Sequence, residues 1–389
     1  MRIVKRTAVS AAAPAAFHAS ERRYDGNSAE MPDKPGIGGF SRKTVPATED
    51  NVRYIGRDLY REGTVWLVQS GSAVEFTVEA RAAEITLRAG NDLPESRELR
   101  PRYAVIVDGE IIRDDVAGSS DENVVLFSGS ETRRALVRVI HLSEAANGAV
   151  GISAVTADSA SDHPVAPSEG NKLRIEFIGD SITCAYGVES ASCDEGFRTT
   201  TENFMKSYAY LAAEELGADY STVCFSGYGI ISGYTADGTK NEDFLLPPYY
   251  GVYGIDYPEK WDFSAKPCGI VVICLGTNDS TYIRSDPGTR GAEFKDAYRE
   301  FLEAVRRNNP VAHIICTHGI MGAGSEYKMI EQAIDEYTMS SGDSRVTCYR
   351  APEQLPEDGF GADWHPSAAT QRKNASLLAD VIRQLTGSK

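Results

Sequence analysis

The pattern of hydrophobic and polar positions changes near residue 158. Before that point, short runs alternate between apolar and polar residues, as Val74, Phe76 and Val78 do in the segment AVEFTVEA. The pair Asp108-Gly109 lies between two apolar runs and predicts a hairpin with a two-residue turn. A series of short strands without helical periodicity is typical of an antiparallel, jelly-roll-like β-sandwich, which we expect over residues 49–158.

A polar, proline-containing segment, residues 159–171, predicts a linker, and the pattern after it is different. Five nearly continuous apolar runs alternate there with helical stretches: LRIEFI, YSTVCF, GIVVICL, VAHIIC and RVTCYR. Between the third and fourth runs, apolar residues from Phe294 to Val305 recur at helical spacing. Buried strands separated by helices indicate a parallel sheet covered on both faces, so residues 172–389 are expected to form an α/β domain.

Length and charge narrow the class of protein. A chain of 389 residues favours two domains, and a net charge of −16 argues against binding to nucleic acid or to an anionic membrane surface. Residues 1–48 are rich in Ala, Ser and Pro, lack periodicity, and are expected to form a poorly ordered lead-in. Its apolar run is too weak for a secretory signal, which favours the cytoplasm over export.

The chain has seven cysteines, and their apolar surroundings favour buried, reduced thiols. Cys184 and Cys193 flank a short loop and could form a disulfide if the protein is exported. The sequence has no C-x-x-C pair and no histidine cluster that would indicate zinc. We therefore expect neither a metal nor another cofactor.

Residues able to do chemistry follow four of the five predicted strands. The carboxyl ends of parallel strands lie at one edge of a sheet, so the loops that follow them are expected to meet. These loops contain Gly-Asp-Ser, SGYG, GTND and GADWHP. They supply a hydroxyl, glycines, an amide and a carboxylate–imidazole pair: Ser181; Gly227 and Gly229; Asn278; Asp363 and His365.

This set predicts acyl transfer through a serine nucleophile. Ser181 would give its proton to His365, and Asp363 would orient the imidazole and stabilise its charged form. The backbone N–H groups of Ser181 and Gly227, together with the Asn278 amide, would hold the oxyanion. Each motif alone is more often a turn, a helix cap or a surface loop. The prediction depends on finding all four in order at equivalent strand ends.

The blocks GDSIT, SGYG, GTND and DWHP resemble those of the SGNH hydrolases, also called GDSL-type esterases, over about residues 170–389. With the strand-rich domain in front and the segment GIDYPEKWDFS, the chain resembles family 2 of the carbohydrate esterases over about residues 50–389. The resemblance implies a flavodoxin-like hydrolase domain that works without a cofactor. It also implies the activity of acetyl xylan esterases, which remove O-acetyl groups from plant polysaccharides, often from a sugar 6-hydroxyl.

The resemblance leaves two assignments open. The acid of the general SGNH pattern lies three residues before the histidine, where this chain has Ala362, whereas Asp363 lies two residues before His365. Members of the esterase family are known both with this spacing and with a serine–histidine dyad supported by a backbone carbonyl. An alignment shift of two residues also leaves Gly229 as an alternative to Gly227.

The aromatic residues are candidates for binding sugar. Trp364 resembles a family tryptophan that stacks on a sugar ring, which suits the apolar faces of pyranoses. Tyr257 and Trp261 are either sugar contacts or ordinary packing residues, and Asp279 is expected to hold its own loop.

The expected partner is an acetylated oligosaccharide or polysaccharide, not nucleic acid or a membrane, and the oligomeric state is left open. The alternatives are a lipase or thioesterase of the same fold, or a carbohydrate-binding protein with an inactive site.

Overall fold

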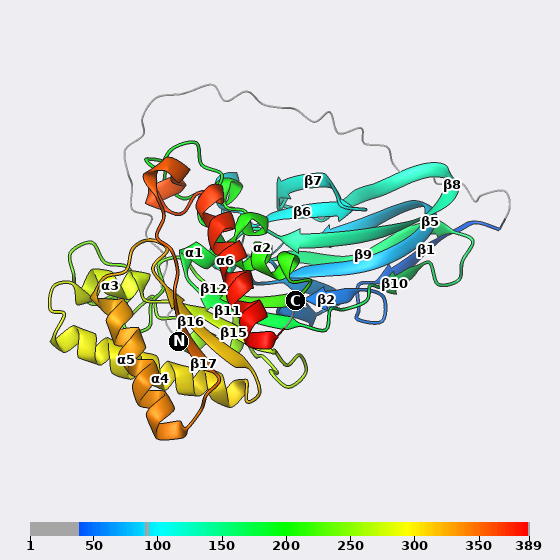
Figure 1. The fold of residues 1–389 in the computed structure, drawn as a ribbon. Coiled ribbons are helices and arrows are strands. Elements are labelled where there is room, and N and C mark those ends of the chain that lie inside the picture. The colour runs from blue at the N-terminus through cyan, green and yellow to red at the C-terminus, as the bar shows by residue number, and fades with distance from the viewer. Residues whose placement is uncertain (1–38, 89, 91–92, 388–389) are drawn as a thin grey trace.

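The computed structural model describes residues 39–88, 90 and 93–387, and it confirms the predicted fold class: a β domain precedes an α/β domain (Figure 1). The β domain contains β1 Ser41–Pro46, β2 Arg53–Ile55, β3 Asp58–Arg61, β4 Thr64–Leu67, β5 Ala73–Arg88, β6 Arg102–Val107, β7 Glu110–Val116, β8 Glu122–His141, β9 Val150–Ser159 and β10 Val165–Pro167. The α/β domain contains β11 Arg174–Gly179, α1 Ser181–Cys184, α2 Tyr208–Glu215, β12 Asp219–Cys224, β13 Val252–Gly254, β14 Tyr257–Lys260, β15 Ile270–Cys274, α3 Thr277–Ile283, α4 Thr289–Asn308, β16 His313–His318, α5 Ser325–Ser341, β17 Val346–Arg350 and α6 Ala368–Thr386.

The strands of the β domain form one continuous antiparallel sheet around an apolar core. Strands β5 and β8 pair along most of their length, and shifts of register near Ala82 interrupt the pairing. The first half of β5 pairs with β2 and β10, whereas its second half pairs with β9. The sheet therefore forms two layers without a break. The predicted hairpin joins β6 and β7, and Asp108 and Gly109 both have positive φ, 51° and 86°, as a primed two-residue turn requires.

Strand pairing extends beyond the limits predicted for the β-sandwich. Strand β1 begins at Ser41, within the segment assigned to the lead-in, and pairs with β9. Strand β10 lies within the segment assigned to the linker and pairs with β5. Both strands are too short or too polar to show alternation in the sequence, and backbone hydrogen bonds hold them in the sheet. The rest of the predicted lead-in, residues 1–38, lies outside the described residues.

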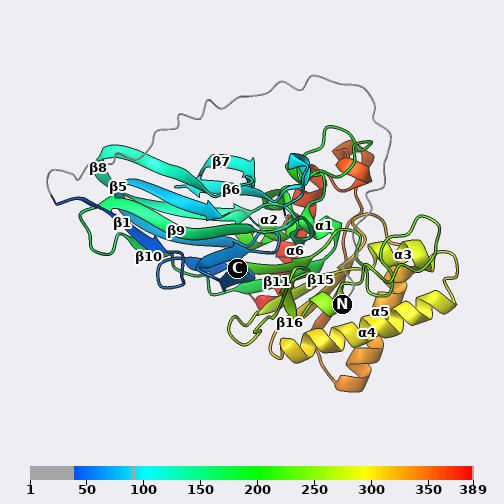
Figure 2. The same ribbon diagram turned by 180° about the vertical axis from the view of Figure 1, so that it is seen from behind.

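All five predicted strands of the second domain occur in a parallel sheet of order β12-β11-β15-β16-β17. Helices α4 and α5 cover one face, with Phe301 and Ile330 against Val271, and α2 and α6 cover the other. Figures 1 and 2 show the β domain on one side of this α/β domain and helices α4 and α5 on the side away from it. The strand order reverses beside β11, so a ligand site is expected beyond the carboxyl ends of β11, β12 and β15. In the described part of the chain, no helix is long and apolar enough to cross a membrane.

A buried ion pair joins the two domains. The side chains of Arg57, between β2 and β3, and Glu176, in β11, are 0% and 1% exposed, and their Nη2 and Oε1 atoms lie 2.8 Å apart. Arg57 also donates hydrogen bonds of 2.6 and 2.8 Å to the carbonyl oxygens of Tyr250 and Val252. A charge at this depth is tolerated because both terminal nitrogens of the guanidinium have acceptors and aromatic rings lie against it, although Nε has no hydrogen-bond partner.

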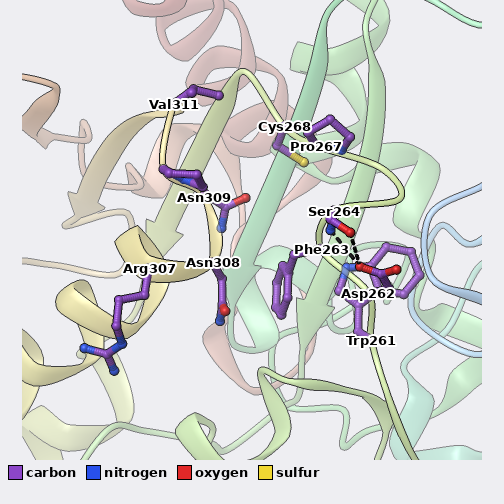
Figure 3. Close-up of a pocket in the computed structure, with 11 residues that line it drawn as sticks. Trp261, Asp262, Phe263, Ser264, Pro267, Cys268, Arg307, Asn308, Asn309 and Val311 are labelled. Carbon is purple, nitrogen blue, oxygen red and sulfur yellow. Dashed lines mark hydrogen bonds between the residues drawn. The ribbon is translucent and has the colours of Figure 1, made fainter.

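A surface pocket of about 580 Å³ lies beside this ion pair, at the amino ends of β15 and β16 (Figure 3). It is lined by two segments, residues 261–268 and 307–311. The Arg57 guanidinium lies 5.2 Å from the ring centroids of both Trp261 and Phe263. Trp261 therefore covers a buried cation at the edge of the sheet opposite to the loops that follow the strands, which favours the packing alternative for this residue.

The Cys184–Cys193 disulfide, which the sequence left open for an exported protein, does not occur in the structure. All seven cysteines are unpaired, and Cys184 is buried whereas Cys193 is only partly buried. The structure therefore agrees with the expectation of reduced thiols.

Replacing Arg57 with Ala should lower the free energy of unfolding by about 3–5 kcal/mol, because the Glu176 carboxylate would stay buried without its cation. The matched control is Arg61→Ala, which removes an exposed pair with Glu259 and should cost at most about 1 kcal/mol. Urea denaturation of the two variants and the wild type measures both losses. Losses of similar size would show that the buried pair does not hold the domains together.

Candidate active site

Ser181 and His365 lie in direct contact at the predicted edge of the parallel sheet. Ser181 is the first residue of the one-turn helix α1, which follows β11 directly, and Asp180 caps this helix by accepting the Ile182 N–H at 3.0 Å. The Ser181 hydroxyl oxygen lies 2.8 Å from Nε2 of His365. This is the arrangement in which an imidazole can take the proton of a serine hydroxyl.

The other ring nitrogen of His365 faces a backbone carbonyl. Its Nδ1 lies 3.0 Å from the carbonyl oxygen of Ala362. A carbonyl can only accept a hydrogen bond, so Nδ1 must carry the proton in the neutral ring. The unprotonated nitrogen is then Nε2, which faces Ser181. The contact with Ala362 therefore fixes the tautomer that a general base needs.

Backbone strain brings the Ala362 carbonyl to this position. Asp363 and Trp364 both have left-handed φ, 47° and 62°, which is uncommon for residues other than glycine. The resulting tight turn also lets the His365 N–H donate to the same Ala362 oxygen at 3.0 Å. Further bonds hold the turn: the Ala362 N–H donates to Gly187 O at 3.1 Å, and the Asp363 N–H donates to Glu195 O at 3.1 Å.

Asp363 is not the hydrogen-bond partner of His365 that the triad prediction required. Nδ1 contacts the Ala362 carbonyl instead, and Oδ2 of Asp363 accepts a 2.5 Å hydrogen bond from the Tyr186 hydroxyl. The Tyr186 ring stacks on the imidazole, with ring centroids 4.1 Å apart and planes inclined by 26°. Asp363 therefore contacts His365 indirectly, through Tyr186. Tyr186 was not predicted as a site residue, although it lies only five residues after Ser181, because no sequence motif marks a stacking partner.

Two backbone N–H groups at the site are available to a ligand. Among the described residues, no acceptor binds the N–H of Ser181 or of Gly227. Gly227 has a φ of 81°, which favours glycine, and it is the third residue of a turn closed by the Tyr228 N–H on Phe225 O at 3.3 Å. The Gly229 N–H already donates to Phe244 O at 3.0 Å. Of the two glycines left open by the sequence, the geometry favours Gly227 as a donor.

Asn278 and Asp279 open helix α3 and are both buried. Asn278 Nδ2 donates to Tyr228 O at 2.8 Å and lies 3.4 Å from an Asp180 carboxylate oxygen. This places its amide between the loops that follow β11 and β12. Asp279 accepts hydrogen bonds of 2.8 to 3.1 Å from three consecutive backbone N–H groups, residues 230–232. The expectation that Asp279 holds its own loop is therefore wrong, because its carboxylate points to the neighbouring loop.

The pKa values of the site follow from burial. Burial lowers the pKa of His365, and the Ala362 carbonyl and the Asp363 charge offset part of this effect. Burial also raises the pKa of Asp180 to about 7 and that of Asp279 to about 6. The described residues contain no group of three or more His, Cys, Asp or Glu side chains that could hold a metal ion.

Two large aromatic side chains are exposed on loops of the site. Trp364 is 55% exposed, and its ring lies 5.2 Å from the ring of Phe360. Tyr234 is 58% exposed, and its N–H donates to Gly227 O at 2.9 Å. Tyr257, in contrast, lies in the hairpin β13–β14, with its ring 5.1 Å from the guanidinium of Arg61 in the β domain. Its substrate role stays a prediction.

Comparison with known proteins connects this geometry to characterised families. Residues 177–373 match the GDSL-like lipase/acylhydrolase family, and residues 54–167 match the carbohydrate esterase 2 N-terminal domain. The cellulase/esterase CelE of Acetivibrio thermocellus is 33% identical over 325 residues, which cover 82% of this chain but only 37% of that protein. An acetylxylan esterase / glucomannan deacetylase of Cellvibrio japonicus is 26% identical over 284 residues, 72% of this chain and 75% of that protein.

Solved structures of carbohydrate esterases share the fold of this chain. A family two carbohydrate esterase from Clostridium thermocellum, in complex with cellohexaose, has a TM-score of 0.76 and 30% identity, and the match covers 87% of this chain and 100% of that one. An acetyl xylan esterase (Est2A) from the rumen bacterium Butyrivibrio proteoclasticus shares the fold, with a TM-score of 0.78 and 22% identity over 89% of this chain and 99% of that one.

The pKa of the His365 ring should lie below 6.5, the ordinary value for histidine, because burial disfavours the imidazolium. The ring would then stay neutral, and able to accept a proton, in mildly acidic solution. An NMR titration of the ring resonances measures this pKa directly. Asp363→Asn should lower it further, since it removes a negative charge that favours the imidazolium. A wild-type value above 6.5, or a rise in the Asn variant, would contradict this account of the ring's surroundings.

Proposed function

The chain belongs to the GDSL-like lipase/acylhydrolase family and, within it, to family 2 of the carbohydrate esterases, and we propose that it removes O-acetyl groups from polysaccharides or oligosaccharides. The observation that carries the proposal is the contact between Ser181 Oγ and His365 Nε2, with Nδ1 on a carbonyl. The names of the relatives, acetylxylan esterase and glucomannan deacetylase, support an acetylated plant polysaccharide as the substrate class.

In the proposed reaction, His365 Nε2 takes the Ser181 proton while Oγ attacks the acetyl carbonyl carbon. The carbonyl π electrons move to its oxygen, which becomes the oxyanion. The imidazolium then gives its proton to the sugar oxygen as the ester bond breaks, leaving acetyl-Ser181 and a free sugar hydroxyl. A water molecule, deprotonated by the same nitrogen, attacks the acetyl carbon. The imidazolium then returns the proton to Ser181 Oγ as the acyl bond breaks and acetate leaves.

The unoccupied N–H groups of Ser181 and Gly227 support an oxyanion site at the start of α1. Asn278 would contribute the second hydrogen of its Nδ2, whose long contact with Asp180, 3.4 Å, is weak enough to exchange for an oxyanion. Because the first hydrogen is held by Tyr228 O, the amide needs no reorientation to do this.

The ring of His365 is supported by a carbonyl in this proposal, and the enzyme works as a serine–histidine dyad. Tyr186 and Asp363 hold the ring and its turn from outside. Trp364 and Tyr234 present exposed rings on loops adjoining His365 and Gly227, which suits stacking on the apolar faces of sugars. Both rings belong to the substrate platform in this proposal.

The wild-type protein should release acetate from acetylated mannan or xylan, and Ser181→Ala should lower the turnover by a factor on the order of 10⁶. His365→Ala should cause a loss of turnover of the same order, because neither residue can carry out the nucleophilic attack effectively without the other. Enzymatic assay of acetate over a panel of acetylated polysaccharides measures these rates, and thermal unfolding checks that the variants fold. A folded Ser181→Ala variant of near-native activity would refute the proposal.

Asp363→Ala should lower kcat by only about tenfold, far less than the roughly 10⁴-fold loss seen when the acid of a full triad is replaced. The reason is that the Ala362 carbonyl, and not the carboxylate, holds the Nδ1 proton. Initial rates on an aryl acetate compare this variant with His365→Ala. If the two losses are equal, the carboxylate reaches the ring during the reaction and the enzyme is a triad.

A further inference from the structure

A carboxylate from the β domain contacts the turn that contains Gly227. The Ser226 N–H donates to Glu144 Oε2 at 2.7 Å. Glu144 lies between β8 and a short 3-10 helix, residues 145–147, and is only 4% exposed. The residue that directly precedes the proposed oxyanion donor is therefore held by the other domain.

Glu144 is itself held in place by the buried residue Glu202. The Glu144 N–H donates to Glu202 Oε2 at 2.9 Å, and Glu202 is fully buried. Arg102, in β6, donates to the Glu202 carbonyl oxygen at 3.1 Å and pairs with Glu189 at 2.6 Å. Burial and the neighbouring Glu144 raise the pKa of Glu202. Glu144 is thus held at its backbone by Glu202 and at its carboxylate by Ser226.

The direction of the Gly227 N–H depends on this contact. Gly227 is the third residue of a four-residue turn, and the peptide plane before it can rotate between alternative turn types. Rotation would point its N–H away from Ser181. The bond from Ser226 to Glu144 anchors the peptide plane that precedes Ser226. The Tyr234 N–H, which donates to Gly227 O at 2.9 Å, anchors the plane after Gly227. The plane that carries the Gly227 N–H therefore lies between two anchored planes, and loss of the Glu144 contact would release one of them.

We propose that Glu144 is a positioning residue for the oxyanion loop, supplied by the β domain. It acts through Ser226, without touching the substrate, by aiming the Gly227 N–H at the acetyl oxygen. This inference rests on the proposed function. It assigns to the β domain a part in the reaction in addition to its structural contacts.

Two substitutions distinguish the effect of the length of the Glu144 side chain from the effect of its charge. Glu144→Gln keeps an oxygen acceptor at the same distance and loses the charge, whereas Glu144→Asp keeps the charge and withdraws the acceptor by one methylene. The Asp variant should lose about 10- to 100-fold in kcat on an aryl acetate with KM unchanged, because a misplacement of about 1 Å can cost 10²-fold. The Gln variant should retain most of the turnover that the Asp variant loses.

The matched control is Glu84→Asp, the same shortening of a buried β-domain carboxylate that pairs with Arg42. This variant should keep the wild-type kcat. If Glu144→Gln loses as much kcat as Glu144→Asp, the charge of Glu144 matters and the length of its side chain does not, and the proposal is overturned. A rise in KM alone, or an equal loss of kcat in the control, would also overturn it.

A readout that needs no turnover separates this inference from the proposed function. The amide ¹⁵N and ¹H chemical shifts of Ser226 and Gly227 should change in Glu144→Asp and stay near the wild type in Glu144→Gln. Unchanged shifts in the Asp variant would refute the positioning role whatever the activity. A wild-type protein that does not hydrolyse acetyl esters, but shows the expected shifts, would refute the proposed function and leave the contact standing.

Discussion

The hydrogen bond from His365 Nδ1 to the Ala362 carbonyl is the contact on which the rest of the site depends. It decides which nitrogen carries the proton and so makes Nε2 an acceptor for the Ser181 hydroxyl. It exists only because Asp363 and Trp364 both adopt left-handed backbone conformations. Such strain persists when the surroundings fix it, and here the stacked Tyr186 and the hydrogen bonds that the turn donates to the carbonyls of Gly187 and Glu195 do so.

The arrangement of the second domain was largely predictable from the sequence. Its strands are nearly continuous apolar runs, and the carboxyl ends of parallel strands meet whatever the details of the connections. That rule brings Ser181 and His365, 184 residues apart in the chain, to the same edge of the sheet, where they lie 2.8 Å apart. The hairpin at Asp108-Gly109 was equally predictable, since its two residues favour the positive φ that the turn needs.

What the sequence did not predict depends on backbone conformation and on contacts between distant segments. The spacing of Asp363 and His365 suggested a carboxylate–imidazole pair, and only the conformation of the turn determines that a carbonyl takes that place. No pattern in the sequence connects Glu144 with Ser226, because the contact arises where two domains pack. Strands β1 and β10 were missed for a related reason: edge strands can be held by backbone bonds alone, with side chains that show no apolar alternation.

The Arg57–Glu176 pair has a consequence for how such a protein can change over evolutionary time. Glu176 is a buried charged residue in β11, and its cation is encoded more than a hundred residues earlier, in a different domain. A gene fragment encoding the α/β domain alone would give a sheet with an unneutralised carboxylate in one of its strands. Recombination at the boundary between the two domains would therefore give products of lower stability. The two halves should be inherited, and exchanged between larger multidomain proteins, as one module.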